Sequence, residues 1–318
     1  MQFATVGAVE APGPSGRRPA WGDECSRFGS AESTTIRLCV HLVCAVCLGA
    51  FVLWGIKADP PIKGFFCNDQ SIRYPLKAET VPANLATVIV IGVPLIIFAA
   101  VELMQALVVD RSGLNYTRLM CCSLPKMLLD VYAVVGGFAF GLLLNFSLAN
   151  VAKLCIGRLR PHFLDVCRPN WNALQCTDTT GDLYVNSYQC NGPDLEAIKE
   201  ARLSFFSAHS SNSSCAMIYT VIYLQYRLSN STYCGPLIPS LTQRQRSNNL
   251  GTWAWDTATA LRPFIQAVLL ILCLFIALSR VMDYFHHPTD VLTGLFVGTI
   301  VAFYSAFYVS KLHLLGRI

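Results

Sequence analysis

The chain has 318 residues, of which 53% are hydrophobic and only 14% are charged, and its mean hydropathy is +0.46. Soluble domains carry roughly 25% charged residues, so this composition excludes a disordered chain, a coiled coil and a typical cytosolic enzyme. The net charge of +5 is small and spread along the sequence, without a basic run of the kind that binds nucleic acid. We therefore expect an integral membrane protein with several spans and no nucleic-acid partner.

The two ends of the chain are polar. Residues 1–34 are rich in Gly, Pro, Ala and Ser and contain no apolar stretch of the signal-peptide type, which predicts a disordered cytosolic tail. Residues 312–318 are expected to form a short cytosolic C-terminal tail. Because no internal repeat or second domain lies between them, residues 35–311 are predicted to form one membrane domain.

Six stretches reach the length of about 20 mostly apolar residues that a spanning helix needs. They are roughly 35–56, 84–108, 127–150, 207–228, 261–279 and 289–310. The fourth is polar in its first two turns, which indicates an end that faces protein or water rather than lipid. The expected fold is an all-α bundle of six transmembrane helices.

Six spans place both ends of the chain on one side, which we take as the cytosol. The connections 57–83 and 151–206 then face outside, and residues 229–260 form a flexible inner loop. Lys and Arg divide almost evenly between the two sides, so the positive-inside rule supports this orientation only weakly.

Cysteines give a second indication of orientation. Besides Cys155, which lies next to the third span, the outer connections contain four of the 14 cysteines of the chain. They are Cys67, Cys167, Cys176 and Cys190. An even number on an oxidising side allows two disulfides, whose pairing the sequence does not give; free thiols in loops are the alternative.

Three segments concentrate polar residues that are costly in a membrane, and each lies at an outer end of a span. Residues 153–161 follow the third span, residues 207–210 open the fourth, and residues 279–290 join the fifth to the sixth. Because alternating spans bring these ends to the same side, we expect the three segments to converge on one site.

The residue types of these segments fit phosphate chemistry. Lys153, Arg160 and Arg280 can surround a polyanion, and the arginines offer forked donors to its oxygens. Ser207 and the amides from Ala208 onward add neutral donors at a helix N-terminus. No acidic cluster of the metal-ligand type accompanies them, so we expect no metal, and the cations would neutralise the charge themselves.

Histidines in the same segments can supply the reaction. His286 with Asp290 forms a nucleophile with an orienting carboxylate, and His209 can protonate a leaving oxygen. Pro288 suits the first turn of the sixth helix. Taken singly, these residues also fit a helix-start hydrogen bond, a helix cap and arginines that snorkel to the interface. We assign Arg158 to snorkelling and His287 to the lipid interface.

The order K-x6-R-P, S-x-H and S-R-x5-H-x3-D is the three-part signature of the phosphatidic acid phosphatase type 2 and haloperoxidase superfamily. The stretches GRLRPHFLDVCRPNW, ARLSFFSAHSS, LSRVMDYFHHPTDVLTGLFVG and GFFCNDQSIRYPLK are similar to those of animal lipid phosphate phosphatases of the wunen type. The resemblance extends over roughly residues 35–311. It implies a helical bundle of the phosphatidic acid phosphatase type 2 kind.

The resemblance also implies an activity. Such enzymes hydrolyse phosphatidate, lysophosphatidate, sphingosine 1-phosphate and ceramide 1-phosphate at the outer or lumenal face, without magnesium or another cofactor. Lys153, Arg160 and Arg280 would bind phosphate with help from Ser207 and the amide of Ala208. His286 would form a phosphohistidine, Asp290 would orient it and His209 would protonate the departing alkoxide. The partners are then membrane lipids, and relatives often form homo-oligomers.

The resemblance leaves alternatives open. The family has Gly where this chain has Ala208, which would be strained at positive φ and lower the activity. A non-catalytic relative that acts as a membrane interaction protein is therefore a second hypothesis, and a phosphatase of soluble sugar phosphates is a third. We expect the plasma membrane with the site facing outside; the chain shows no retention motif that would separate this from internal membranes.

Overall fold

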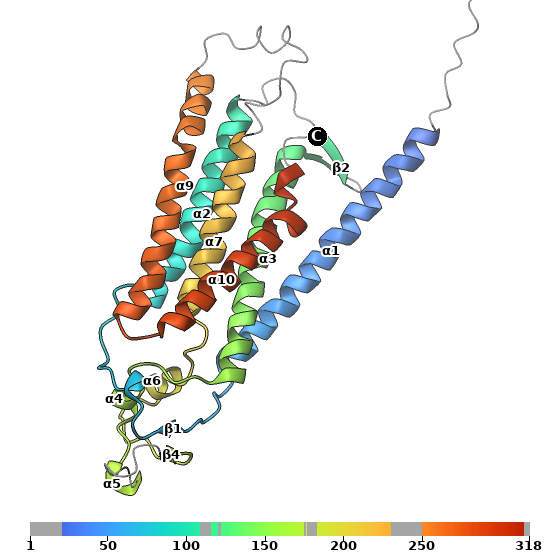
Figure 1. Ribbon diagram of the computed structural model, residues 1–318. Coiled ribbons are helices and arrows are strands. Elements are labelled where there is room, and N and C mark those ends of the chain that lie inside the picture. The colour runs from blue at the N-terminus through green and yellow to red at the C-terminus, as the bar shows by residue number, and fades with distance from the viewer. Residues whose placement is uncertain are drawn as a thin grey trace, which may run out of the picture.

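The computed structural model describes residues 21–108, 116–119, 122–174, 176, 183–229 and 250–314 (Figure 1). The long helices of this described part form a bundle, with a small cap at one end. They are α1 (Trp21–Lys57), α2 (Ala83–Val108), α3 (Lys126–Ile156), α7 (Ala208–Ser229), α9 (Leu250–Met282) and α10 (Pro288–Tyr304). Each overlaps a predicted span, and α10 begins at Pro288 as expected. A π-helical turn, η4 (Ser305–Val309), and a 3-10 turn, η5 (Leu312–Leu314), follow α10.

Five of these helices are long and apolar enough to cross a membrane: α1, α2, α3, α9 and α10 together with η4. The predicted helical membrane fold is confirmed. The helix in the position of the fourth predicted span, α7, is not among the five because its first turns are polar.

Several boundaries differ from the prediction. Helix α1 begins at Trp21 because no proline interrupts the chain between Pro19 and Pro60, so the second part of the predicted tail 1–34 is helical. Residues 1–20 of that tail lie outside the described residues. Helix α9 begins at Leu250, which shortens the predicted inner loop, and residues 230–249 lie outside the described part.

Helix α7 lies inside the bundle and contacts α2, α3, α9 and α10 (Figure 1). Ser210, Ser211, Ser213 and Ser214 are buried, and glycines of α10 lie at very short range from the first turns of α7. A Cβ atom added to Gly298 would lie 2.1 Å from the carbonyl oxygen of Ser211, and one added to Gly294 would lie 2.7 Å from that of Ser207. Ser214 Oγ also donates to the carbonyl of Leu295 at 2.9 Å. The polarity of α7 therefore serves close helix packing.

The end of the bundle opposite the cap holds a buried charge network. Arg227 of α7 donates to Glu102 of α2 at 2.6 Å and lies 3.3 Å from Asp130 of α3. Tyr223 donates to the same glutamate at 2.8 Å. The network therefore joins three helices at this end. Nearby, β2 (Tyr116–Leu119) and β3 (Cys122–Pro125) form an antiparallel hairpin.

The cap is built from the two predicted outer connections. Strand β1 (Phe65–Phe66) of the first pairs antiparallel with β4 (Tyr184–Val185) of the second. The remaining elements are η1 (Gln70–Ile72), α4 (Phe163–Cys167), α5 (Trp171–Leu174) and α6 (Leu195–Glu200). Phe65, Leu159 and Phe163 belong to a separate small core. Disulfides join Cys67 to Cys176 and Cys167 to Cys190, and the first of these ties the two connections together.

Candidate active site

A cavity of about 690 Å³ lies where the bundle meets the cap. Its polar part is lined by side chains from all three predicted motif segments, together with two carboxylates. They are Lys153, Arg160, His209, Arg280, His286, Glu79 and Glu200. The predicted convergence of the segments is therefore seen in the structure.

The rest of the cavity wall is largely apolar. It comes from the parts of α1, α2 and α3 nearest the cap and includes Ile56, Val90, Ile91, Phe146 and Leu154. Because these three helices are apolar enough to lie in a bilayer, the cavity joins a charged end to a surface suited to hydrocarbon.

His286 lies in the short turn between α9 and α10. Its ring Nδ1 is 2.8 Å from the backbone carbonyl oxygen of Ser204. A carbonyl can only accept, so Nδ1 carries the proton and Nε2 keeps its lone pair. Burial of the ring lowers the pKa of His286 well below its usual value, and the positive charges of Arg160 and Lys153 lower it further. The imidazole is therefore neutral at pH 7, the form that a nucleophile requires.

Asp290, in the first turn of α10, is fully buried and makes a different set of bonds from the predicted one. Its carboxylate accepts from Arg158 Nη1 at 2.6 Å, from Ser204 Oγ at 2.5 Å and from the backbone N–H of His287 at 3.2 Å. Among these contacts, Ser204 is the one that also touches His286. The structure therefore links Asp290 to His286 through Ser204 and not by direct contact.

Two side-chain nitrogen atoms of residues that line the cavity are buried and have no hydrogen-bond partner among the described residues. They are Nε of Arg160 and Nε2 of His209. Buried polar groups are normally satisfied, so an unpaired donor and an unpaired ring nitrogen beside one cavity indicate a ligand that would complete them. A phosphate ester oxygen could accept from both if His209 is protonated at Nε2.

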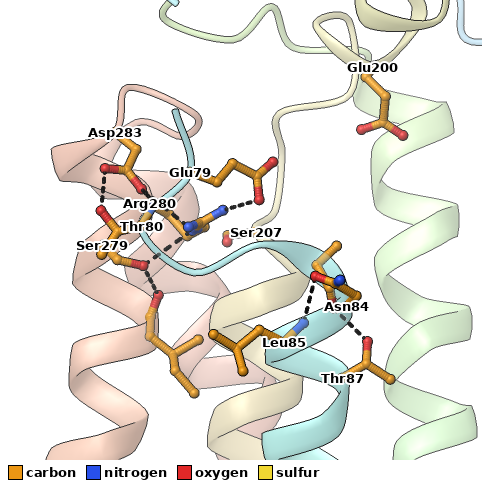
Figure 2. Close-up of polar contacts among 12 residues, drawn as sticks. Glu79, Thr80, Asn84, Leu85, Thr87, Glu200, Ser207, Ser279, Arg280 and Asp283 are labelled. Carbon is orange, nitrogen blue, oxygen red and sulfur yellow. Dashed lines mark hydrogen bonds and ion pairs between the residues drawn. The ribbon is translucent and has the colours of Figure 1, made fainter. Parts of the chain in front are cut away.

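Arg280 is fully buried at the end of α9 and is held on several sides (Figure 2). Its guanidinium lies 3.2 Å from a carboxylate oxygen of Glu79 and 3.3 Å from one of Asp283. Asp283 in turn accepts from the backbone N–H of Thr80 at 2.7 Å and from its hydroxyl at 2.8 Å. The first outer connection therefore fixes this arginine.

The predicted neutral donors differ from each other in position. Ala208 lines the cavity, whereas Ser207 is fully buried behind it and is not part of the cavity wall. The N–H of Ser207 donates to the carbonyl of Asp290 at 3.2 Å, and its Oγ accepts from Ser210 Oγ at 3.0 Å. Ser207 therefore holds the start of α7 against the start of α10.

Two assignments outside the predicted site are wrong. Arg158 does not snorkel to the interface but pairs with Asp290. His287 is buried rather than lipid-facing, and its Nε2 lies 3.1 Å from the carbonyl of Leu159. Both residues are held there because the chain before Arg160 runs beside the start of α10.

Ser204, Glu79 and Glu200 also belong to the site, although no sequence motif predicts them. Ser204 and Glu200 lie just before the S-x-H segment, and Glu79 lies just before the second span. Their nearness to those elements is the one signal that could have suggested them. Among the described residues, no group of three or more His, Cys, Asp or Glu side chains could hold a metal ion.

Comparisons with known proteins show which family the chain resembles. The sequence profile of the PAP2 superfamily matches residues 134–313. Phospholipid phosphatase 1 of Rattus norvegicus is 34% identical over 272 residues, which cover 85% of this chain and 84% of the relative. Phospholipid phosphatase 2 of Homo sapiens is 35% identical over 261 residues, which cover 82% of this chain and 77% of the relative. No solved structure matches the chain significantly.

These matches cover more than half of the chain and include all three motif segments. The chain therefore belongs to the PAP2 superfamily. The predicted enzyme class, a phosphatase, is confirmed by the relatives.

Proposed function

We propose that the chain removes the phosphate group from lipid phosphates such as phosphatidate, lysophosphatidate, sphingosine 1-phosphate and ceramide 1-phosphate. The observation that carries this proposal is the two-part cavity, with three cations and three histidines (His162, His209 and His286) at one end and an apolar wall from α1, α2 and α3 along the rest. A phosphate fits the charged end, while the hydrocarbon tails stay among apolar helices. The names of the relatives support the same substrate class.

The side chains can divide the reaction among them. Nε2 of His286 attacks phosphorus and forms a P–N bond as the P–O bond to the lipid breaks. His209 gives its proton to the departing alkoxide. Water, deprotonated by His209, then attacks phosphorus as the P–N bond to His286 breaks, which releases inorganic phosphate and restores the imidazole. Lys153, Arg160 and Arg280 stabilise the charge on the phosphate oxygens.

The site is proposed to face the outer or lumenal side of the membrane. Both disulfides lie in the cap that covers the cavity, and such bonds persist in oxidising compartments. This supports an orientation with the cap outside and the charge network of Arg227 at the cytosolic end.

The first test is phosphate release from dispersed phosphatidate and lysophosphatidate in EDTA, with wild type beside His286→Ala. We expect release by the wild type and a loss of at least roughly 10³-fold in the variant, because the nucleophile is gone. His41→Ala is the matched control and should retain activity, because His41 is an exposed residue of α1 that contacts Tyr132 at 3.3 Å and does not line the cavity.

Glucose 6-phosphate serves as the competing substrate. Faster release from the sugar phosphate than from the lipids would contradict a lipid substrate. No release by folded wild type from any of the three would contradict the enzymatic proposal and favour a membrane interaction protein.

A further inference from the structure

Two carboxylates lie among the cations to which the proposed function assigns the phosphate. Glu200 Oε2 is 2.7 Å from Arg160 Nη2, and Glu79 Oε2 is 3.2 Å from Arg280 Nη1. Both glutamates line the cavity. Glu79 belongs to the first outer connection and Glu200 to the second. Figure 2 shows Glu79 in contact with Arg280 and Glu200 on the segment above.

The burial of each pair is unequal. The side chain of Arg160 is 8% exposed, whereas that of Glu200 is 61% exposed; for Arg280 and Glu79 the values are 0% and 30%. An ion pair with an exposed partner contributes little stability, so the carboxylate can leave at small cost. Each arginine has a second contact: the guanidinium of Arg160 lies over the ring of Phe285, 5.6 Å from its centroid, and Arg280 keeps Asp283.

The charges of the cavity explain why carboxylates lie there. Lys153, Arg160 and Arg280 would repel one another in a site without anions, and they would bind an inorganic phosphate product tightly. Burial tends to raise the pKa of Glu200, but Arg160 and Lys153 together lower it, so the side chain is ionised at pH 7. Its negative charge therefore offsets the positive charges of the site while no phosphate is bound.

We propose that Glu200 and Glu79 are exchangeable counter-ions of the phosphate site. They pair with Arg160 and Arg280 while the site is empty, they give way when the phosphate group of the substrate enters, and they return to compete with inorganic phosphate as it leaves. This inference rests on the proposed function, because it assumes that the same arginines receive the phosphate. The two glutamates would set how tightly the site holds phosphate without taking part in bond making.

The test uses Glu200→Gln and Glu79→Gln in the full chain, with inorganic orthophosphate as the probe. Glutamine keeps the size of the side chain and removes its charge. We expect each variant to be inhibited by orthophosphate at a concentration roughly fivefold lower than wild type, and its KM to fall in the same direction. Thermal unfolding with and without orthophosphate gives a second readout that needs no activity, and stabilisation should be larger in the variants.

Glu196→Gln is the matched control, since Glu196 is exposed on the same helix, α6, and does not line the cavity. Weaker inhibition in the glutamine variants would overturn the proposal, because it would mean that the carboxylates only position the arginines. Unchanged inhibition would overturn it as well. If one variant does not fold, the other decides. If orthophosphate stabilises the folded wild type but the wild type releases no orthophosphate from lipid phosphates, the result contradicts the proposed function and not this inference.

Discussion

At the scale of single residues, the proposed nucleophile His286 is held by a backbone carbonyl. The backbone carbonyl of Ser204 accepts a hydrogen bond from Nδ1 of His286, and the hydroxyl of Ser204 donates a hydrogen bond to Asp290. Side-chain spacing alone suggests a direct histidine–carboxylate pair, because a backbone contact leaves no trace in residue types. The segment that supplies this carbonyl is fixed by a bond from the N–H of Ser204 to the carbonyl of Arg158 at 2.9 Å.

Ala208 supplies a prediction at this scale. It is the first residue of α7 and is not among the non-glycine residues with positive φ in the described part of the chain. The strain expected from the sequence is therefore not found, so Ala208→Gly should change kcat/KM by less than roughly threefold. The variant should also unfold at a slightly lower temperature, because Gly in a helix is roughly 1 kcal/mol less favourable than Ala.

Phosphate release and thermal unfolding of the purified variant check both parts of this expectation. A rise in kcat/KM of roughly tenfold or more would show that the methyl group obstructs the phosphate in the cavity. In that case the alanine, and not the orientation of His286, would limit the activity of this chain.

At the scale of elements, the contact between α7 and α10 sets the geometry of the site. These helices begin at Ala208 and Pro288, so His209 and Asp290 lie at their adjoining starts. The glycines of α10 allow the close approach that the serines of α7 need. A change that separates the two helices should therefore act on both stability and catalysis.

Gly298→Ala tests this contact. Its new Cβ would meet the carbonyl oxygen of Ser211, so the helices must move apart, at a cost of roughly 1–3 kcal/mol in unfolding free energy. We expect a lower unfolding temperature and a clear loss of kcat. Gly92→Ala in α2 is the control, because its Cβ would meet no atom within 4 Å and should be neutral or slightly stabilising. Equal behaviour of the two variants would disprove the role of the contact.

The elements also show what the sequence can predict. Apolar stretches place all six long helices, since hydropathy is read directly from residue types. Because the spans follow from hydropathy and alternate in direction, the sequence also predicts that the cations and histidines lie on the same side. By contrast, Arg280 and Glu79 are 201 positions apart and Arg158 and Asp290 are 132 apart. Such pairs depend on how the cap folds back, and no local pattern of residues encodes it.

At the scale of the whole molecule, the cap and the charge network of Arg227 lie at opposite ends of the bundle. The proposed orientation can be tested with single cysteines at exposed positions: Leu195→Cys on α6 and Trp253→Cys near the start of α9, whose side chains belong to residues 76% exposed in each case. An impermeant maleimide on intact cells should label the first and not the second. Both should react after permeabilisation, and wild type gives the background from native cysteines. Labelling of Trp253→Cys alone would reverse the orientation.

The first outer connection contacts the site, although it lies outside the segment that matches the family profile. The superfamily profile matches residues 134–313 and so includes every proposed catalytic side chain, yet Thr80 lies outside it and donates to Asp283, which pairs with Arg280. Tyr74 adds to this by stacking on Tyr284, with ring centroids 4.5 Å apart. A fragment limited to residues 134–313 would keep the proposed catalytic side chains but would lose the contacts that hold Arg280 in place. Conversely, engineering of residues 74–80 offers a way to retune the enzyme while its signature motifs stay untouched.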